Sequence, residues 1–497
     1  MTNGIGRVGW RNFVSAPTNN PLWDNLVAYY TGDNTPNDSK GTANGTLVNG
    51  TTYATGKINN GFIFDGINDY ATFGNNIDLT GLAPFSFNFW VNPTAATANS
   101  VFFSKYDGTK GYLIRKSANG NYVNLAILSS GSSYISVSSN SIVIPSNSYS
   151  MITVTYNGTP NISGIKIYVN ATSDTLTALY QAFSTSASNT SNFLMGSLAT
   201  NANFYNGKID ECGVWDRVIT QTEVTELYNA GAGKQYVAPT YTTRTTAFAT
   251  ATGITDTTIL NALNTFDTGL ISNGLDTKMK AVYPFVGGTS TTHKFNFMDA
   301  RDVDAAFRLS FNGGYIHSST GAKPNGTNAY ANTFLTPSVV TSNYNSVGAS
   351  VYIRDNTQFD YGREFGCYGS TIGNYQFSFL NRYTTNLAYI RASVSGFVGT
   401  SGTLSNSSGL LTLNRNLSTT HELYRNGALV FDGAITGAGL PEYNLYLSAQ
   451  NGLGYITENY SPREMSFFAY HDGLTSGQIS TFNSLTQALQ TSLSRQV

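Results

Sequence analysis

Charged side chains are scarce in this chain of 497 residues, at 11% of the total. A typical soluble domain carries roughly 25%, so the polar surface must be made mainly of Asn, Thr, Ser, Gly and Tyr. That composition is typical of strands and turns. The formal net charge of −1 excludes the basic stripe that nucleic-acid binding requires. No apolar run approaches the roughly 20 residues of a membrane span, so we expect neither nucleic-acid binding nor membrane insertion.

Cysteine and histidine are also rare, with two and four residues. The two cysteines, Cys212 and Cys367, are too few for a disulfide framework, so we expect buried free thiols in preference to a bridge. The histidines do not have the spacing of metal ligands. They are His293, His317, His421 and His471.

The N-terminal residues contain no apolar stretch of the kind that a secretory signal peptide needs. Residues 1–22 are rich in Gly and Asn. They fit either a disordered tail or an anchor that docks on a larger assembly. In the second case Arg7, Trp10 and Arg11 are the expected contacts, because Trp and Arg are favoured at protein interfaces.

The chain repeats a set of landmarks in the same order and at near-equal spacing. A Gly-x-Asn-x-Tyr-Ala turn occurs at residues 66–71 and again at 326–331. Alternating strands that run into Asn follow at 167–170 and 423–426. Repetition on this scale predicts two copies of one all-β unit.

Local patterns place strands and short helices within each copy. Phe85, Phe87 and Phe89 alternate with other residues, which predicts a strand with period two. Thr220 followed by Glu223 forms a capping box that starts a short helix. Apolar residues recur at helical spacing from 259 to 270, which predicts a helix that packs under the second sandwich or serves as a trimer-forming or partner-docking stripe.

The first copy resembles the laminin-G-like, concanavalin-A-like jelly-roll family over most of residues 23–236. The resemblance rests on the motifs at residues 26–30, 64–70, 89–91, 207–211 and 215–217. It implies two packed antiparallel sheets with sugar or protein binding at one rim. The second copy lacks the Phe-Asp that precedes the first turn and the Ile-Asp-Glu near the end of the first copy, so we expect the same fold there without the same site.

The fold class that follows is all-β, with two tandem concanavalin-A-like jelly-roll sandwiches, a short helical linker and an N-terminal anchor segment. The expected domains are an N-terminal anchor at 1–22, a laminin-G-like jelly roll at 23–237, a linker with short helices at 238–285 and a second jelly roll at 286–497.

Other segments are similar to structural proteins of bacteriophages that infect Bacteroidetes-type bacteria. They are residues 4–11 and the stretches at 261–264, 283–288 and 323–328. The resemblance implies a head-fibre, capsid-decoration or tail-fibre protein whose partners are capsid or tail proteins. We therefore expect a virion protein that assembles in the host cytoplasm, which also accounts for an adhesive composition without an export signal.

The sequence gives little support for catalysis. Glycoside hydrolysis on such a fold needs two carboxylates that face one cleft at roughly 5 to 10 Å, and no Glu-x-Asp-x-Glu string occurs. Asp210 and Glu211 are adjacent, so on a regular strand they point to opposite faces. We predict that the protein is not an enzyme.

The expected cofactor is none, or a structural calcium ion. Asp33 and Asp38 flank a loop rich in carbonyl groups, and Asp210 could reach the same rim. Calcium prefers carboxylate and backbone oxygens. The alternative is that each Asp bonds to nearby backbone amides in an Asx-turn.

Tyrosines on loops beside Asn and Asp are candidates for sugar stacking, and we name Tyr106, Tyr112 and Tyr134. The alternative is that they belong to the core or the sheet surface. The leading hypothesis is a virion protein that binds host-surface carbohydrate, as a homo-oligomer in which avidity raises a weak affinity; a trimer is the favoured form. A capsid-stabilising protein without sugar binding is the alternative.

Overall fold

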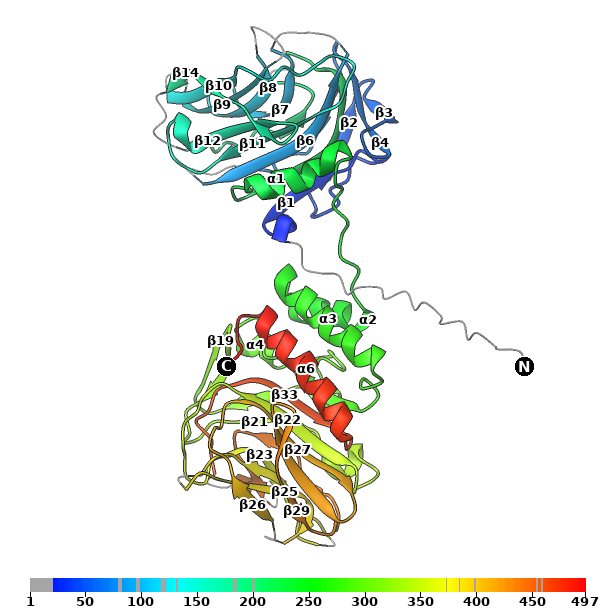
Figure 1. Cartoon of the computed structure of the whole chain (residues 1–497), viewed down its shortest axis with the longest axis vertical. Coiled ribbons are helices and arrows are strands. Elements are labelled where there is room, and N and C mark those ends of the chain that lie inside the picture. The colour runs from blue at the N-terminus through cyan, green and yellow to red at the C-terminus, as the bar shows by residue number, and fades with distance from the viewer. Residues whose placement is uncertain are drawn as a thin grey trace, which may run out of the picture. The chain divides into compact units, whose positions relative to one another are not determined.

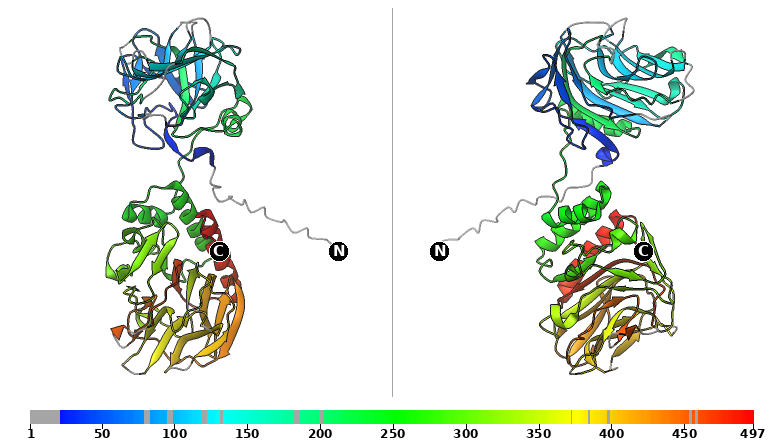
Figure 2. Two further views of the ribbon diagram at one scale, coloured as in Figure 1. Left: turned by 90° about the vertical axis from the view of Figure 1, so that its left-hand side faces the viewer. Right: turned by 180° about the vertical axis from the view of Figure 1, so that it is seen from behind.

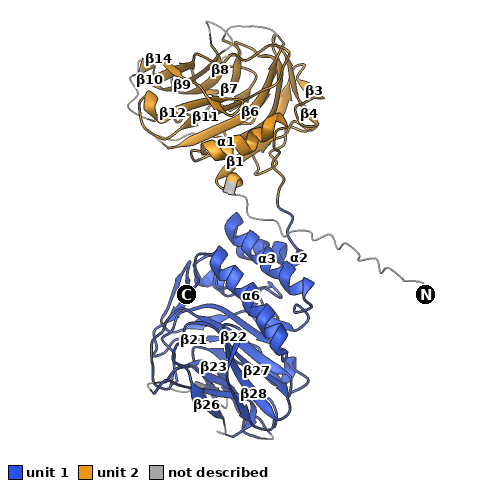
Figure 3. Cartoon of the chain, viewed as in Figure 1, with its two compact units in different colours: residues 1–19, 239–497 blue, residues 20–238 orange. Residues whose placement is uncertain are grey.

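The computed structural model describes residues 21–78, 83–94, 99–117, 122–130, 133–181, 186–198, 202–371, 373–383, 385–396, 399–452, 455–456 and 459–497. The chain divides into two compact units, shown in orange and blue in Figure 3. We call residues 20–238 the N-terminal unit and residues 239–497 the C-terminal unit. Each is a two-sheet sandwich (Figure 1), so the prediction of two tandem all-β jelly rolls is confirmed.

The N-terminal unit has two sheets that we name after central strands. The β6 sheet runs β13 (Thr172–Ser173), β12 (Ile165–Val169), β11 (Ser150–Tyr156), β6 (Phe85–Pro93), β16 (Asn206–Trp215), β4 (Asn60–Asp65) and β3 (Thr52–Thr55), and β1 (Leu26–Tyr30) also pairs with β16. The β9 sheet runs β14 (Leu176–Gln181), β10 (Ser133–Ser139), β9 (Val123–Ser130), β8 (Gly111–Lys116), β7 (Val101–Tyr106), β15 (Leu194–Met195), β5 (Tyr70–Thr72) and β2 (Thr46–Val48).

Successive side chains of β6 point to opposite faces of the sheet, as predicted. Phe85, Phe87 and Phe89 are buried in the core between the sheets, while Trp90 lies in a separate apolar cluster on the outer face of the β6 sheet. Helix α1 (Gln221–Tyr228) covers that cluster and begins with the expected capping box of Thr220 and Glu223. Three short 3-10 turns complete the unit: η1 (Pro21–Trp23), η2 (Ile162–Gly164) and η3 (Asn229–Gly231).

The C-terminal unit repeats this plan with more helix. The β22 sheet runs β19 (Tyr315–Ser318), β20 (Gly321–Pro324), β33 (Met465–His471), β22 (Val347–Ile353), β27 (Gly409–Leu417), β28 (Thr420–Arg425) and β29 (Ala428–Ala434), and β17 (Met279–Tyr283) also pairs with β33. The β24 sheet runs β18 (Ser310–Asn312), β21 (Tyr330–Asn332), β30 (Tyr446–Leu447), β23 (Arg363–Tyr368), β24 (Tyr375–Leu380), β25 (Leu387–Ser395) and β26 (Thr400–Thr403), with β31 (Asn451–Gly452) and β32 (Tyr455–Ile456) attached beside β23.

Helices cover the outer face of the β22 sheet. The described helices of the C-terminal unit are α2 (Thr243–Thr252), α3 (Thr257–Ser272), α4 (Ser290–His293), α5 (Pro337–Val340) and α6 (Ser476–Ser492), with the 3-10 turn η4 (Asp304–Ala306). Phe266 of α3 and Phe482 of α6 contact Phe467 of β33, and α3 lies against α6 in both views of Figure 2. The apolar stripe of residues 259–270 is thus used inside the unit, and the segment expected as a linker contributes to its core.

The repeated landmarks have equivalent places in the two units. Gly66 and Gly326 both adopt positive φ, 76° and 74°, in the turn before β5 and β21, a conformation that favours glycine. Cys212 and Cys367 are buried free thiols, one in each core, as expected. No helix in the described part of the chain is long and apolar enough to cross a membrane.

Candidate functional site

The face of the C-terminal sandwich opposite the helices is the outer face of the β24 sheet. Phe365, Phe377 and Ile390 of its central strands point into the core, so their alternating neighbours point outward. In the cross-strand register Gly366 lies opposite Ser378, which lies opposite Arg391. These positions form one row of the outer face.

The next row along the same strands joins Arg363, Leu380 and Tyr389. Arg363 and Arg391 therefore lie on the two sides of β24 and point to the same side of the sheet. Burial lowers the pKa of Arg363 to about 9, and the charge of Arg391 adds to this effect. Burial also lowers the pKa of Arg391, so both guanidinium groups are partly removed from water.

Several polar atoms of this face lack partners within the described residues. They are Nε and Nη1 of Arg363, both side-chain polar atoms of Gln376 and Oγ of Ser378. Buried polar groups are usually hydrogen-bonded, and leaving one unsatisfied costs about 1–3 kcal/mol. The neighbouring carboxylate of Glu364 is already engaged, because it forms a fully buried ion pair of 2.7 Å with Arg463. This face thus holds buried donors and acceptors without partners among the described residues.

Three tyrosines border the arginines, and we call them the tyrosine edge: Tyr361, Tyr383 and Tyr389. The ring centroids of Tyr361 and Tyr383 lie 5.3 Å apart, and those of Tyr383 and Tyr389 6.4 Å apart. The hydrogen bond with Tyr361 raises the pKa of Tyr383 to about 12. Tyr361 is 61% exposed and adopts a φ of 62°, as Phe307 and Phe334 of the same unit also adopt positive φ.

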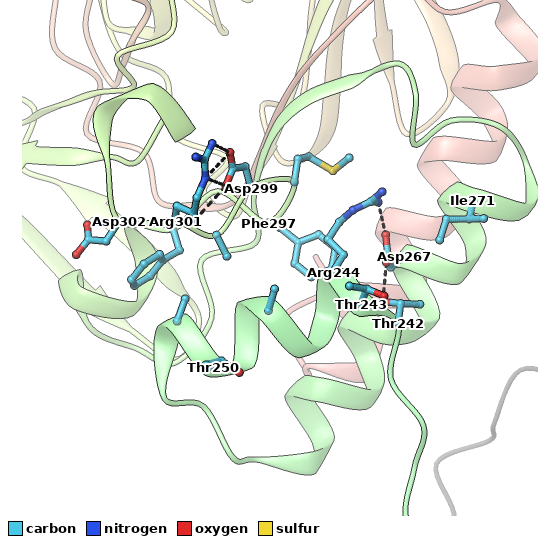
Figure 4. Close-up of a pocket in the computed structure, with 15 residues that line it drawn as sticks. Thr242, Thr243, Arg244, Thr250, Asp267, Ile271, Phe297, Asp299, Arg301 and Asp302 are labelled. Carbon is cyan, nitrogen blue, oxygen red and sulfur yellow. Dashed lines mark hydrogen bonds and ion pairs between the residues drawn. The ribbon is translucent and has the colours of Figure 1, made fainter.

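A cavity lies elsewhere in the C-terminal unit. Figure 4 shows a cavity of about 1200 Å³ between α2, α3 and the segment 295–302. Its polar groups bond one another: Asp267 accepts from Thr242 Oγ1 at 2.7 Å and pairs with Arg244, and Arg301 pairs with Asp299 at 2.5 Å. A ligand there would meet mainly apolar side chains such as Phe297.

The three aspartates expected at a calcium site bind backbone amides instead. Asp38 accepts from the amides of Tyr29 and Lys40 at 3.0 and 2.9 Å. Asp33 accepts from the Asn60 amide at 3.0 Å. Asp210 holds the loop at residues 57–58, accepting both amides at 2.6 and 3.0 Å. In the described residues no group of three or more His, Cys, Asp or Glu could hold a metal ion. Asp38 matches the Asx-turn alternative because Lys40 is two residues away, whereas Asp33 and Asp210 bind amides distant in the sequence.

The expected opposite orientation of Asp210 and Glu211 was wrong. Glu211 has a φ of 48°, and the register of β16 with β6 shifts between Asp210 and Gly213, which marks a β-bulge. Asp210 lies opposite Trp90 of the outer cluster, and Glu211 accepts from Tyr29 Oη at 2.5 Å, so both carboxylates lie on the outer face.

Both carboxylates of this bulge are closed off from solvent. Their side chains are buried, and burial raises the pKa of Glu211 to about 9 and that of Asp210 to about 7. Asp210 binds backbone amides of the loop at 57–58 and one oxygen of Glu211 binds Tyr29, so the pair holds separate segments of the unit together.

The expected sugar-stacking residues have different surroundings. Tyr112 is buried and donates to the Ile77 carbonyl at 2.8 Å, so that assignment was wrong: its ring cannot meet a sugar. Tyr106 is half-buried and donates to the Gly108 carbonyl. Tyr134 stacks on Tyr180 with ring centroids 3.9 Å apart.

The expected anchor contacts Arg7, Trp10 and Arg11 lie outside the described residues. The sequence reasoning missed the tyrosine edge, although two of its members stand beside glycine or arginine in Tyr361-Gly362-Arg363 and Arg382-Tyr383. Loop tyrosines next to arginine were the signal that could have found it.

Comparison with known proteins gives several similar structures and no match among curated proteins. Domain 4 of an extracellular arabinanase from Geobacillus stearothermophilus, in complex with arabinotriose, is 20% identical, with a TM-score of 0.33, over 40% of this chain and 97% of that one. The binding domain of Paraclostridial Mosquitocidal Protein 1 is 11% identical, with a TM-score of 0.35, over 91% and 92%. The binding domain of Botulinum Neurotoxin DC is 11% identical, with a TM-score of 0.33, over 91% and 99%.

The family comparison concerns the N-terminal unit. Residues 65–225 match the family model described as the concanavalin A-like lectin/glucanases superfamily. They include strands from both sheets and most of α1. The resemblance of the first copy to laminin-G-like domains is therefore confirmed: the N-terminal unit contains a domain of the concanavalin A-like lectin/glucanase superfamily.

Proposed function

We propose that this protein is a structural component of a bacteriophage particle, a head fibre or capsid decoration, that binds host-surface glycans through its jelly-roll units. The lectin-like domain at residues 65–225 supports glycan binding. The resemblance of the N-terminal and central segments to phage structural proteins supports the virion role. In this proposal residues 1–22 dock on the particle and the two units are displayed to the host.

The observation that carries the glycan proposal is the outer face of the β24 sheet. A sugar ring presents apolar C–H groups on its faces and hydroxyls at its edges. Tyrosine rings offer rigid amphipathic contact area at low entropic cost, and the tyrosine edge supplies three of them. Gln376 and Ser378 of this face are fully buried, so the contact with a sugar falls to the tyrosine edge, where Tyr361 is 61% exposed.

A glycan array with the full-length chain tests this proposal. We expect Tyr361→Ala to weaken binding about tenfold, because truncating an aromatic contact residue commonly costs more than about 1 kcal/mol. Tyr344→Ala is the matched control, since Tyr344 is another exposed tyrosine of the same unit, at 41%. If the chain bound no glycan, a capsid-stabilising role without sugar binding would replace this proposal.

Position on the particle is tested by deleting residues 1–22. We expect the truncated protein to fold but to be lost from purified particles. Unchanged incorporation would reject the anchor. Immunolabelling of particles then separates a head fibre or decoration from the alternative, a tail-fibre receptor-binding protein, and cross-linking of particles reports whether the protein is a trimer.

A further inference from the structure

We propose that the outer face of the β24 sheet binds an anionic sugar, with its carboxylate or sulfate group held by Arg363 and Arg391 beside the tyrosine edge. This inference rests on the proposed function, because it names the class of glycan. Its support is that two arginines and the tyrosine edge lie on the same face of the β24 sheet.

The cations and rings are neighbours through strand register. Tyr389 and Arg391 are two residues apart on β25, so they point to the same side of the sheet. Arg363 lies in the same cross-strand row as Tyr389, with Leu380 of β24 between them. A ring stacked on the tyrosine edge would therefore place a substituent near both guanidinium groups.

Arg363 is one of several arginines of the unit that form no ion pair among the described residues, and it lies on the outer face of the β24 sheet, whereas Arg415 and Arg495 bind backbone carbonyls. Arginines 244, 301, 308, 354 and 463 each form an ion pair with Asp or Glu. No ion pair among the described residues includes Arg363, and two of its nitrogens have no hydrogen-bond partner there. A guanidinium with five donors is suited to carboxylate and sulfate oxygens.

The electrostatic setting favours an anion at this place. Two like charges face each other across β24, and each is partly desolvated. Charges interact more strongly where water is excluded, so one bound anion would offset the repulsion between the two guanidinium groups. Glu364 does not serve this purpose because Arg463 and Ser461 already bind it.

One nearby group opposes the anion. Asp360 is exposed and close enough to Tyr383 to contribute to its raised pKa. Its carboxylate borders the site on the side of the tyrosines, away from the arginine row. It is suited to accept hydrogen bonds from sugar hydroxyls, and its removal is expected to strengthen anion binding.

The test compares binding of the full-length chain to matched glycan pairs that differ only in the anionic group. The pairs are oligogalacturonide and its carboxyl-reduced form, sialyllactose and lactose, and a sulfated galactan and its desulfated form. We expect at least one anionic member to bind about tenfold or more tightly than its neutral counterpart, since a charged hydrogen-bonded pair contributes at least that much. The carboxylated and sulfated arms distinguish the two anions.

Variants then locate the anion. Arg391→Gln and Arg363→Gln should each remove the preference for the anionic member while retaining neutral binding, and Asp360→Asn should increase it. Arg301→Gln is the control, because Arg301 is 69% exposed and already paired with Asp299. If Arg363→Gln lowers the thermal midpoint, its loss of binding could reflect unfolding, and the test then depends on Arg391→Gln.

The outcomes separate this inference from the proposed function. Equal or tighter binding of the neutral members, or an anion preference that survives in Arg391→Gln, would overturn the anionic site and leave glycan binding in place. Absence of binding to any sugar on an array would overturn both.

Discussion

The N-terminal unit contains no histidine, whereas the C-terminal unit buries three histidines as well as the ion-paired carboxylates of Asp267 and Glu364, although both are sandwiches with helix on one sheet. Asp210 and Glu211 are buried beneath the outer cluster of the β6 sheet. In the C-terminal unit His293, His421 and His471 are buried. Burial lowers the pKa values of these histidines to about 3, 4 and 4. The two units should therefore lose stability in opposite directions of pH.

The faces opposite the helices also differ. On the β9 sheet of the N-terminal unit, Arg115 donates to Asn124 at 2.8 Å and Asn124 donates to the Val137 carbonyl at 2.7 Å, so the polar groups bond one another. On the β24 sheet Arg363 and Gln376 hold unpartnered atoms within the described part of the chain. The same architecture thus carries mutually bonded polar side chains at the centre of one face and unpartnered ones at the centre of the other.

The largest expected effect is acid destabilisation of the C-terminal unit. A buried neutral histidine stabilises the fold fully above its unfolded pKa of 6.5 and loses that stability as pH falls toward its lower folded pKa. Each of the three histidines should lower the free energy of unfolding by ~1.4 kcal/mol per pH unit within that window. Their contributions add. Between pH 6.5 and 4 the C-terminal unit should unfold before the N-terminal unit.

Fluorescence separates the two units in the intact chain. All 4 tryptophans, residues 10, 23, 90 and 215, precede the C-terminal unit. As pH falls, the far-UV circular dichroism signal should decrease before tryptophan fluorescence changes. In His471→Gln the decrease of the dichroism signal with falling pH should be less steep. Coincident transitions would contradict the assignment of acid sensitivity to one unit.

The next effect concerns Glu211, whose contribution to stability is lost as pH rises and not as pH falls. Its folded pKa is raised, so its contribution is full below its ordinary value of 4.5 and is lost as pH rises toward about 9. Glu211→Gln keeps an acceptor for Tyr29 and removes the ionisation. Relative to the wild type, this variant should gain ~1.4 kcal/mol per pH unit across that window, measured by urea unfolding followed by tryptophan fluorescence. A parallel pH dependence in both proteins would show that Glu211 does not titrate there.

A smaller effect tests whether glycan binding belongs to one unit. Tyr383→Ala should weaken binding about tenfold, whereas Tyr134→Ala, which breaks the stack with Tyr180 on the N-terminal unit, should leave it unchanged. Affinity measured by calorimetry with one array-selected glycan checks both. Loss of binding in Tyr134→Ala alone would move the site to the β9 sheet and reverse the comparison.

The smallest expected effect is that of a chelator. Because Asp33, Asp38 and Asp210 hold backbone amides, EDTA should change neither the thermal midpoint nor glycan binding. A calcium-dependent rise in the midpoint that Asp38→Asn abolishes would restore the metal site.

Much of the fold could be predicted because its signals are local. The alternation of Phe85, Phe87 and Phe89 and the capping box at Thr220 each involve residues within one turn or strand, where the physics depends only on spacing. The repeated Gly66 and Gly326 turns gave the duplication for the same reason. The candidate site was not predictable in this way, since Tyr361, Tyr383 and Arg391 come from different loops and strands.

By itself the sequence determined the all-β class, the two copies and the buried thiols, because period, turn chemistry and composition act over short distances. Only the tertiary structure decided that the bulge at Glu211 brings two carboxylates to one face. It also decided that Arg363 and Arg391 lie on either side of β24 and point to the same side of the sheet, and that the apolar residues between 259 and 270 pack against a sheet. Those outcomes depend on strand register and on which elements pack together, and a shift of one residue in register reverses the face of every side chain.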